Sequence, residues 1–250
     1  MLDYLPSTTS LEDLLPQLRN QGYAVLSAKT VVQWAGCSSE HLHALSADWV
    51  GMPKDAYLKD GGHYRSRRHS CFIFDQGQLR LAPARAHWQS LDYNALHGGM
   101  KRWFDPITSQ TIEQQVWVDL LSAFAQTASD LCLVDPSKQL DVPWCIEAHQ
   151  FRIDTQNGIG RPTPEGAHRD GVDLVGVFMV DRQNIKGGET RVFDAHGSSG
   201  QRFTLTEPWS LLLLDDAKVI HETTPIQPTA QGGYRDTLVL TCRAGAFQGD

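Results

Sequence analysis

The sequence has no paired cysteine motif, no excess of positive charge and no long hydrophobic run. Its five cysteines are odd in number and scattered, without a Cys-x-x-Cys pair, which disfavours a disulfide framework and a structural zinc site. The net charge of −7 disfavours nucleic acid and anionic membranes as main partners. No stretch reaches the length of a membrane span, and residues 1–10 lack the pattern of a secretory leader. We therefore expect a cytoplasmic protein that acts on a small molecule.

The chain is long enough for a sizeable core, with 250 residues of which 41% are hydrophobic. It contains no internal repeat, low-complexity tract or linker. We predict a single domain over residues 1–250, in which residues 1–142 form a helical or mixed support and a substrate-side segment. Residues 143–246 are expected to form the core.

Helical signals dominate the first half of the chain. Thr9 is a candidate N-cap, Glu12 follows three residues later, and a leucine stripe runs from Leu11 to Leu18. The apolar spacing over residues 111–132 predicts a longer helix that covers a sheet or contributes to a homodimer. The other predicted elements of this half are a strand at 23–26, helical stretches at 30–35 and 38–49, and an irregular region at 51–105.

After Pro143 the pattern changes to short apolar runs bounded by turn residues, which is typical of strands. Many short strands without helices favour a sandwich or jelly roll. The predicted strands are residues 146–154, 174–180, 190–193, 203–205, 211–214, 219–220 and 237–242.

His168, Asp170 and His221 are candidate metal ligands. Residues i and i+2 of an extended segment point to the same side, so His168 and Asp170 could bind one ion together. Two imidazoles and one carboxylate that leave part of the ion open are the ligands of non-haem Fe(II) oxygenases. A His-x-Asp triplet alone is weak, because about one is expected by chance at this composition. The alternative is that both histidines are ordinary surface or hydrogen-bonded residues.

Arg235 stands fourteen residues after His221, at the start of an apolar strand. Its planar guanidinium could bind a carboxylate through two hydrogen bonds, and Thr237 on the same face could add a hydroxyl. The alternative is an arginine in a surface hairpin.

Several anchors in the right order make residues 147–243 resemble the 2-oxoglutarate/Fe(II)-dependent dioxygenases, and more narrowly the bacterial branch that contains the free L-isoleucine hydroxylases. The segments that carry the resemblance are His149-Gln-Phe-Arg152, Pro162–Ala167 leading into His168-Arg-Asp170, Gly187-Gly188, Val219-Ile-His221 with Thr224-Pro225, and Arg235-Asp236 followed by Leu-Val-Leu-Thr.

The resemblance implies a mainly β fold with flanking helices (α+β), built on a double-stranded β-helix (jelly roll, cupin-like) core with an N-terminal helical support. It implies that His168, Asp170 and His221 bind Fe(II), and that Arg235, with Thr237 beside it, holds 2-oxoglutarate. The expected activity consumes O2 and 2-oxoglutarate, releases succinate and CO2, and hydroxylates a small substrate. Related halogenases replace the carboxylate ligand with a small residue, so Asp170 favours hydroxylation.

Arg65 and Arg67, in His63-Tyr-Arg-Ser-Arg-Arg-His69, are candidates for binding the carboxylate of a free L-amino acid. The isoleucine hydroxylases have a similar Arg-x-Arg stretch ahead of a strand like Phe72-Ile-Phe74. The alternative is a solvated basic loop or edge strand. His149 is expected to pack in the core, and His41, His43, His87, His97 and His196 to be structural or surface residues.

Two other functions remain open from the sequence. A catalytically idle β-barrel could bind a metal or a small acid as a sensor or regulatory module, although such a module needs neither an open metal face nor a co-substrate anchor. A cupin-like metal enzyme that does not use 2-oxoglutarate would make Arg235 dispensable.

Overall fold

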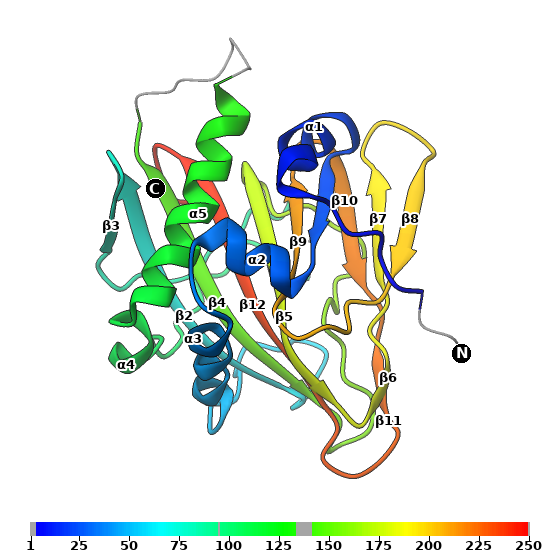
Figure 1. The fold of residues 1–250 in the computed structure, drawn as a ribbon. Coiled ribbons are helices and arrows are strands. Elements are labelled where there is room, and N and C mark those ends of the chain that lie inside the picture. The colour runs from blue at the N-terminus through cyan, green and yellow to red at the C-terminus, as the bar shows by residue number, and fades with distance from the viewer. Residues whose placement is uncertain (1–3, 95, 134–141, 250) are drawn as a thin grey trace.

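The larger of the two main sheets contains seven strands, all paired antiparallel with their neighbours. The computed structural model describes residues 4–94, 96–133 and 142–249. Strands from both halves of the chain form this sheet (Figure 1). Their order is β1 (Tyr23–Leu26), β9 (Ser210–Asp215), β5 (Leu174–Gln183), β12 (Tyr234–Ala244), β4 (Trp144–Asp154), β2 (Arg65–Asp75) and β3 (Gln78–Leu81).

Shorter strands build the opposite layer of the sandwich. The first group has the order β10 (Val219–Thr223), β7 (Thr190–Asp194) and β8 (Gly200–Phe203), and the second pairs β11 (Ile226–Pro228) with β6 (Ile185–Gly187). Two sheets facing each other across a core confirm the predicted jelly-roll architecture.

The leucine run of β9 shows how the sequence encodes three layers. Leu212 and Leu214 pack between the two sheets, whereas Leu211 and Leu213 pack in the core beneath the helices. A strand covered on both faces needs apolar residues at successive positions, which explains why this segment does not alternate.

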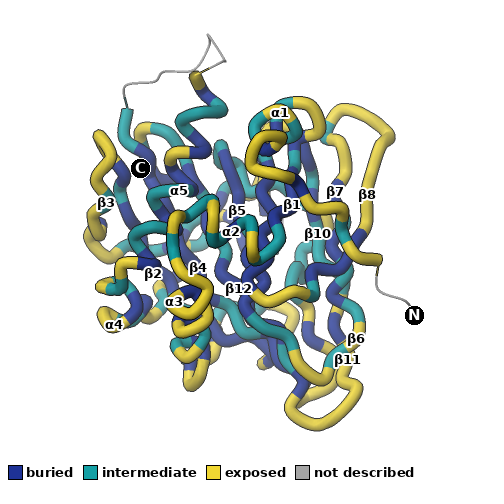
Figure 2. The backbone as a smooth tube through the Cα atoms, viewed as in Figure 1, coloured by how far each residue is buried: buried dark blue, intermediate teal, exposed yellow. Residues whose placement is uncertain are grey.

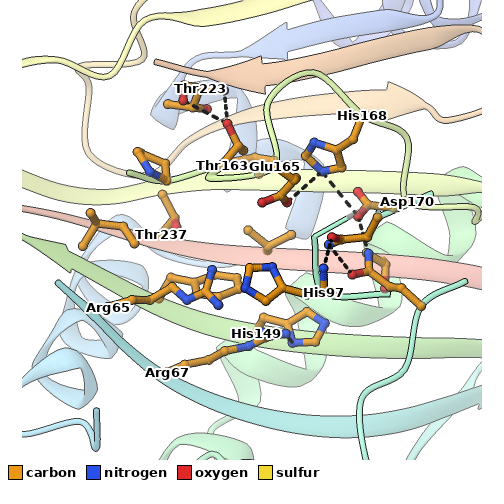
Figure 3. Close-up of a pocket in the computed structure, with 18 of the residues that line it drawn as sticks. Arg65, Arg67, His97, His149, Thr163, Glu165, His168, Asp170, Thr223 and Thr237 are labelled. Carbon is orange, nitrogen blue, oxygen red and sulfur yellow. Dashed lines mark hydrogen bonds and ion pairs between the residues drawn. The ribbon is translucent and has the colours of Figure 1, made fainter. Parts of the chain in front are cut away.

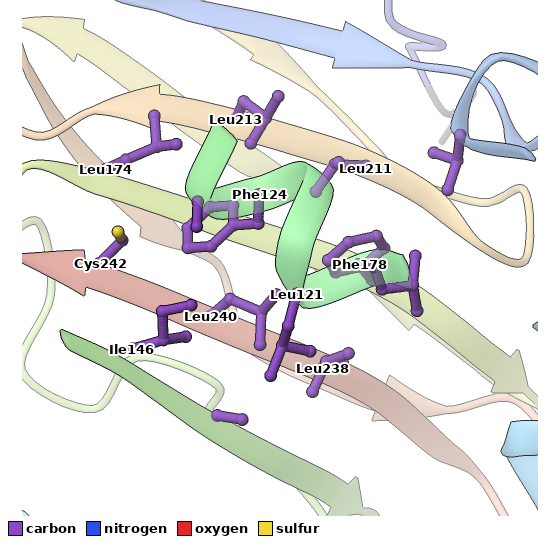
Figure 4. Packing of buried hydrophobic residues seen from close by; sticks show 14 of the residues in the cluster. Leu121, Phe124, Ile146, Leu174, Phe178, Leu211, Leu213, Leu238, Leu240 and Cys242 are labelled. Carbon is purple, nitrogen blue, oxygen red and sulfur yellow. The ribbon is translucent and has the colours of Figure 1, made fainter. Parts of the chain in front are cut away.

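Helices cover the outer face of the large sheet (Figure 1). They are α1 (Leu11–Gln21), α2 (Ala28–Ala35), α3 (Ser39–Ala44), the 3-10 helix η1 (Leu45–Trp49), α4 (Ser109–Ile112) and α5 (Gln115–Cys132). Leu121 and Phe124 of α5 pack on side chains of β4, β5, β9 and β12 (Figure 4). The predicted helix over 111–132 is therefore two helices, and the longer one covers the sheet as expected. Figure 2 shows the resulting buried central strands.

The predicted N-cap of α1 is wrong by one residue. Ser10 caps the helix by accepting a hydrogen bond from the Asp13 backbone amide. Thr9 is buried instead, and its hydroxyl accepts from the Val25 backbone amide and donates to Gln17. It thereby joins the helix to β1.

The prediction of an irregular segment over 51–105 is also wrong, because it contains β2 and β3. β2 lies inside the large sheet, between β4 and β3. Arg65, Arg67 and His69 alternate along it and are buried. A strand whose inner face is polar lacks the apolar alternation by which strands are recognised.

No helix among the described residues is both long enough and apolar enough to cross a lipid bilayer.

Candidate functional site

A cavity between the two layers gathers the predicted site residues. Its volume is about 120 Å³, many times the ~15 Å³ that one water needs, so it can hold a small molecule. All seven predicted site residues, His168, Asp170, His221, Arg235, Thr237, Arg65 and Arg67, line it. Figure 3 shows several of them around the cavity.

Backbone pairing brings His168 and His221 side by side. The His168 amide donates to the His221 carbonyl at 3.0 Å, and the His221 amide donates to the His168 carbonyl at 2.9 Å. Asp170 completes the group: its two carboxylate oxygens lie 3.8 Å from His168 Nε2 and 3.7 Å from His221 Nε2. One potential ligand atom from each of the three residues lies within 4.8 Å of the others, so the three could hold one metal ion.

The loop that carries Asp170 is fixed by a buried carboxylate. Asp216 is fully buried and accepts hydrogen bonds from the backbone amides of Asp170, Gly171 and Val172 at 2.7–3.1 Å. Asp216 follows β9 and precedes His221 by five residues. The same turn therefore fixes the segments that carry all three candidate ligands.

Hydrogen bonds leave the ligand atoms free for a metal. His168 Nδ1 lies 2.9 Å from the Gly166 carbonyl, to which it donates, so in the neutral imidazole Nε2 keeps its lone pair. Burial lowers the pKa of His221 to about 3, so its imidazole is neutral at pH 7. Asp170 Oδ1 accepts from Gln89 Nε2 at 3.0 Å, which leaves Oδ2 as the unoccupied oxygen.

Arg235 is a buried cation that forms no ion pair with any described carboxylate. Its side chain lines the cavity and the residue is 4% exposed. Burial lowers its pKa to about 10, so it stays charged at pH 7. Within the described part of the chain, Nε and Nη2 have no hydrogen-bond partner. Thr237, two residues along β12, lines the same cavity. A desolvated, unpartnered guanidinium fits a site for a carboxylate ligand such as 2-oxoglutarate.

Arg65 and Arg67 enter the cavity from β2 and are not solvated, with 5% and 4% exposure. Arg65 Nε donates to Asp55 at 2.7 Å. Arg67 lies over the rings of Phe104 and Phe151, with its guanidinium carbon 4.1 Å and 4.6 Å from the ring centres. Arg65 Nη2 and Arg67 Nε lack a hydrogen-bond partner among the described residues. Each arginine therefore keeps a donor for a ligand.

A second group, formed by His69, His87, Glu147 and His149, lies behind Arg67. These residues also bring potential ligand atoms within 4.8 Å of one another. Glu147 Oε2 is already used within the group, because it accepts hydrogen bonds from His69 Nε2 at 2.8 Å and from His87 Nδ1 at 2.7 Å.

Arg67 Nη2 donates to His149 Nδ1 at 2.9 Å, which places the proton of a neutral imidazole on Nε2. His149 then has no free lone pair for a metal. We interpret the group as a hydrogen-bonded support for Arg67.

Sequence reasoning missed several polar residues that line the cavity, among them Gln89, Arg102 and Glu165. His87 and His97, which were expected to be structural or surface residues, line it as well. Gln89 and Arg102 come from the segment between β3 and α4, which has no periodic pattern to mark them. Glu165 stands three residues before His168, and this proximity was the one signal that could have found it.

Comparisons with known proteins agree with this geometry. The model of the 2OG-Fe dioxygenase family matches residues 46–241. None of the curated protein sequences compared with the chain matches it. The crystal structure of a BsmA homolog from Methylobium petroleophilum PM1 is 47% identical, with a TM-score of 0.90; the match covers 98% of this chain and 97% of that one.

Two more distant structures share the fold. IDO from Bacillus thuringiensis is 18% identical with a TM-score of 0.75, covering 95% of this chain and all of that one. The Fe(II)/α-ketoglutarate-dependent dioxygenase TqaL is 18% identical with a TM-score of 0.67, covering 95% and 88%. The family match spans most of the chain, so this protein belongs to the 2OG-Fe dioxygenases, non-haem iron enzymes that use Fe(II) and 2-oxoglutarate.

Proposed function

We propose that this dioxygenase hydroxylates a free L-amino acid. In this proposal His168, Asp170 and His221 hold the iron, and Arg235 with Thr237 holds 2-oxoglutarate. Arg65 and Arg67 bind the carboxylate of the substrate. Bound iron and 2-oxoglutarate supply the oxidising chemistry, in which 2-oxoglutarate becomes succinate and CO2.

The observation that carries the proposal is that two separate sets of arginine donors line one cavity and have no hydrogen-bond partner among the described residues. Arg235 lies on β12, whereas Arg65 and Arg67 lie on β2, with β4 between these strands. 2-Oxoglutarate at Arg235 would leave the donors on β2 available. A buried guanidinium with a free donor is stabilised by an anion, so a second carboxylate fits there.

The protein's own residues would orient the substrate and exclude water. The rings of Phe104 and Phe151 fix the guanidinium of Arg67, and His149 accepts one of its hydrogen bonds. A fixed donor positions a substrate better than a mobile one, because less conformational freedom is lost on binding. Gln89 and Arg102, both buried, add polar groups to the cavity wall from the segment between β3 and α4.

The test is succinate release from 2-oxoglutarate with Fe(II) and O2 in the presence of each of the twenty protein L-amino acids. One or a few should stimulate release above the slow reaction without substrate. In Arg67→Gln the stimulation should disappear while that slow reaction persists. Arg80→Gln, on the exposed face of β3, is the matched control and should behave as wild type.

Two results would contradict the proposal in different ways. If no amino acid stimulates succinate release, the substrate class is wrong. If Arg67→Gln retains full stimulation, the substrate carboxylate binds elsewhere.

A further inference from the structure

Glu165 is a largely buried carboxylate that lines the cavity and has one oxygen without a hydrogen-bond partner among the described residues. Its side chain is 13% exposed, and Oε1 lies 3.7 Å from His168 Nε2. Oε2 is buried and has no hydrogen-bond partner in the described part of the chain. A carboxylate oxygen in this state is stabilised by a hydrogen-bond donor, and most strongly by a charged one.

The backbone around Glu165 is held in place, so the side chain has a defined position. Thr163 Oγ1 donates to the Thr223 carbonyl at 3.0 Å and accepts from the Thr223 amide at 3.0 Å. The Gly166 amide donates to the Thr163 carbonyl at 3.0 Å. These bonds attach the turn that carries Glu165 to β10, the strand that also carries His221.

The arginines lie on the other side of the cavity from Glu165. Figure 3 shows Glu165 beside His168 on one side, and Arg65 and Arg67 on the strands opposite. Arg102 joins the arginine side: it is 2% exposed, donates through Nη2 to Gln89 Oε1 at 3.0 Å, and has a buried Nε without a partner among the described residues.

The charges on the two sides do not balance locally. On the arginine side, three guanidinium groups face only two buried carboxylates, Asp55 and Glu147, so this side carries one positive charge in excess. On the opposite side, where Asp170 is assigned to the metal, Glu165 supplies one further negative charge. Its Oε1 lies 3.7 Å from His168 Nε2, and its Oε2 has no hydrogen-bond partner within the described residues. A ligand that neutralises both sides carries a carboxylate at one end and a cation at the other.

We propose that Glu165 binds the ammonium group of the substrate and makes the site select a zwitterion over the corresponding carboxylic acid. Arg102 lies with Arg65 and Arg67 on the side of the cavity that binds the substrate's carboxylate. The proposal rests on the proposed function, because it assumes that the substrate occupies this cavity beside the metal. Glu165 is then a specificity-determining residue, since a buried carboxylate left without its partner rejects ligands that lack the amine.

The experiment measures binding rather than turnover. Wild-type protein is loaded with Mn(II) and 2-oxoglutarate, and calorimetric titration finds which of the twenty protein L-amino acids binds most tightly. The dissociation constant of that amino acid is then compared with that of the same acid lacking the α-amino group, in wild type, in Glu165→Gln and in the control Glu113→Gln. Glu113 is exposed on the surface beside α4.

The wild type should prefer the amino acid by about 10- to 100-fold, the range expected of a charge-assisted hydrogen bond. In Glu165→Gln this preference should fall to about threefold or less, while the deaminated acid and 2-oxoglutarate bind as in wild type. Those two affinities also show that the variant is folded. Glu113→Gln should keep the full preference.

The outcomes separate the two proposals. If Glu165→Gln keeps the preference, or if the wild type binds the deaminated acid as tightly as the amino acid, the role of Glu165 is overturned and the proposed function stands. If 2-oxoglutarate binds but no amino acid does, the proposed substrate class fails and this inference fails with it.

Discussion

Arg235 shows most clearly, at the scale of a single residue, how burial reveals a function. Its guanidinium is removed from water and its Nε and Nη2 atoms find no partner within the described chain. Burying an isolated charge lowers the stability of the folded protein. A protein therefore retains such a charge where a ligand of opposite charge binds to it. The large sheet brings this residue into the cavity that contains the His168, Asp170 and His221 group.

Arg235→Gln should weaken 2-oxoglutarate binding by at least about 30-fold, because losing one partner of a buried charged pair costs ~2 kcal/mol or more. The measurement is the dissociation constant of 2-oxoglutarate for the Fe(II)-loaded protein without O2. Arg202→Gln, on the exposed β8, is the control. An unchanged affinity would remove Arg235 from the co-substrate site and favour a cupin-like enzyme.

Gln89 is a second residue whose surroundings define its role. Its Oε1 accepts from Asn94 and Arg102, both at 3.0 Å, which directs Nε2 toward Asp170 Oδ1. This amide orients the candidate ligand and connects it to Arg102. Hydrogen bonds of this kind tune metal affinity.

Gln89→Ala should therefore weaken metal binding by about 10- to 100-fold. The amount of free Mn(II), measured by electron paramagnetic resonance during titration, checks this. Gln126→Ala on the exposed face of α5 should bind as wild type. Equal affinities in all three proteins would show that Gln89 does not support the metal site.

At the scale of elements, α5 supports the sheet on which the site is built. Phe124 is fully buried and packs against β5 and β9. Gly176 of β5 permits this contact, since a Cβ there would lie 3.0 Å from the Phe124 ring. Phe124→Ala should lower the free energy of unfolding by about 3–5 kcal/mol, through lost burial and the cavity that remains.

Urea denaturation of Phe124→Ala checks this value, with Leu133→Ala as the control. Leu133 ends the same helix but is 62% exposed, so its replacement should change stability little. A loss below ~1 kcal/mol in Phe124→Ala would mean that α5 contributes little to the sheet.

The elements also show what sequence could predict and what it could not. The leucine run of β9 and the apolar face of α5 correctly predicted a strand and a helix. In both, the apolar residues recur at the spacing that places them on the buried faces of the element. Only the end of β2, at Phe72-Ile-Phe74, was predicted as a strand. Its first part was missed because the inner residues there are arginine and histidine, buried by the cavity rather than by an apolar core. The candidate ligands His168 and Asp170 could be predicted because they stand two residues apart in an extended segment. His221 could be predicted because it lies in a short strand that follows an apolar run and a turn. Gln89 and Arg102 could not, because only the tertiary fold brings their segment over the cavity.

At the scale of the whole molecule, buried histidines make stability depend on pH. Burial lowers the pKa of His87 to about 3 and that of His97 to about 4, and also lowers those of His69 and His149. The unfolded chain binds protons near pH 6.5, where the folded protein does not. The free energy of unfolding that these neutral histidines contribute is therefore fully present above pH 6.5 and is lost as the pH falls toward 3–4. Asp236 opposes this trend, because burial raises its pKa to about 6.

His87→Gln isolates one such contribution. Between pH 7 and pH 5 the wild type should lose about 2 kcal/mol of unfolding free energy through His87, and the variant should lack this loss. Denaturant titrations at both pH values measure the difference, with the exposed His43→Gln as the control. The same pH dependence in His87→Gln as in wild type would show that this imidazole is not held neutral.

The central claim is that His168, Asp170 and His221 hold iron with 2-oxoglutarate bound beside them. The most direct measurement is an anaerobic titration of the apoprotein with Fe(II) and 2-oxoglutarate, following the visible charge-transfer band of the chelate. We predict the band in wild type and in the exposed His196→Ala control, and its loss in folded His221→Ala. A folded wild-type protein without the band, or a His221→Ala variant that keeps it, would contradict this assignment.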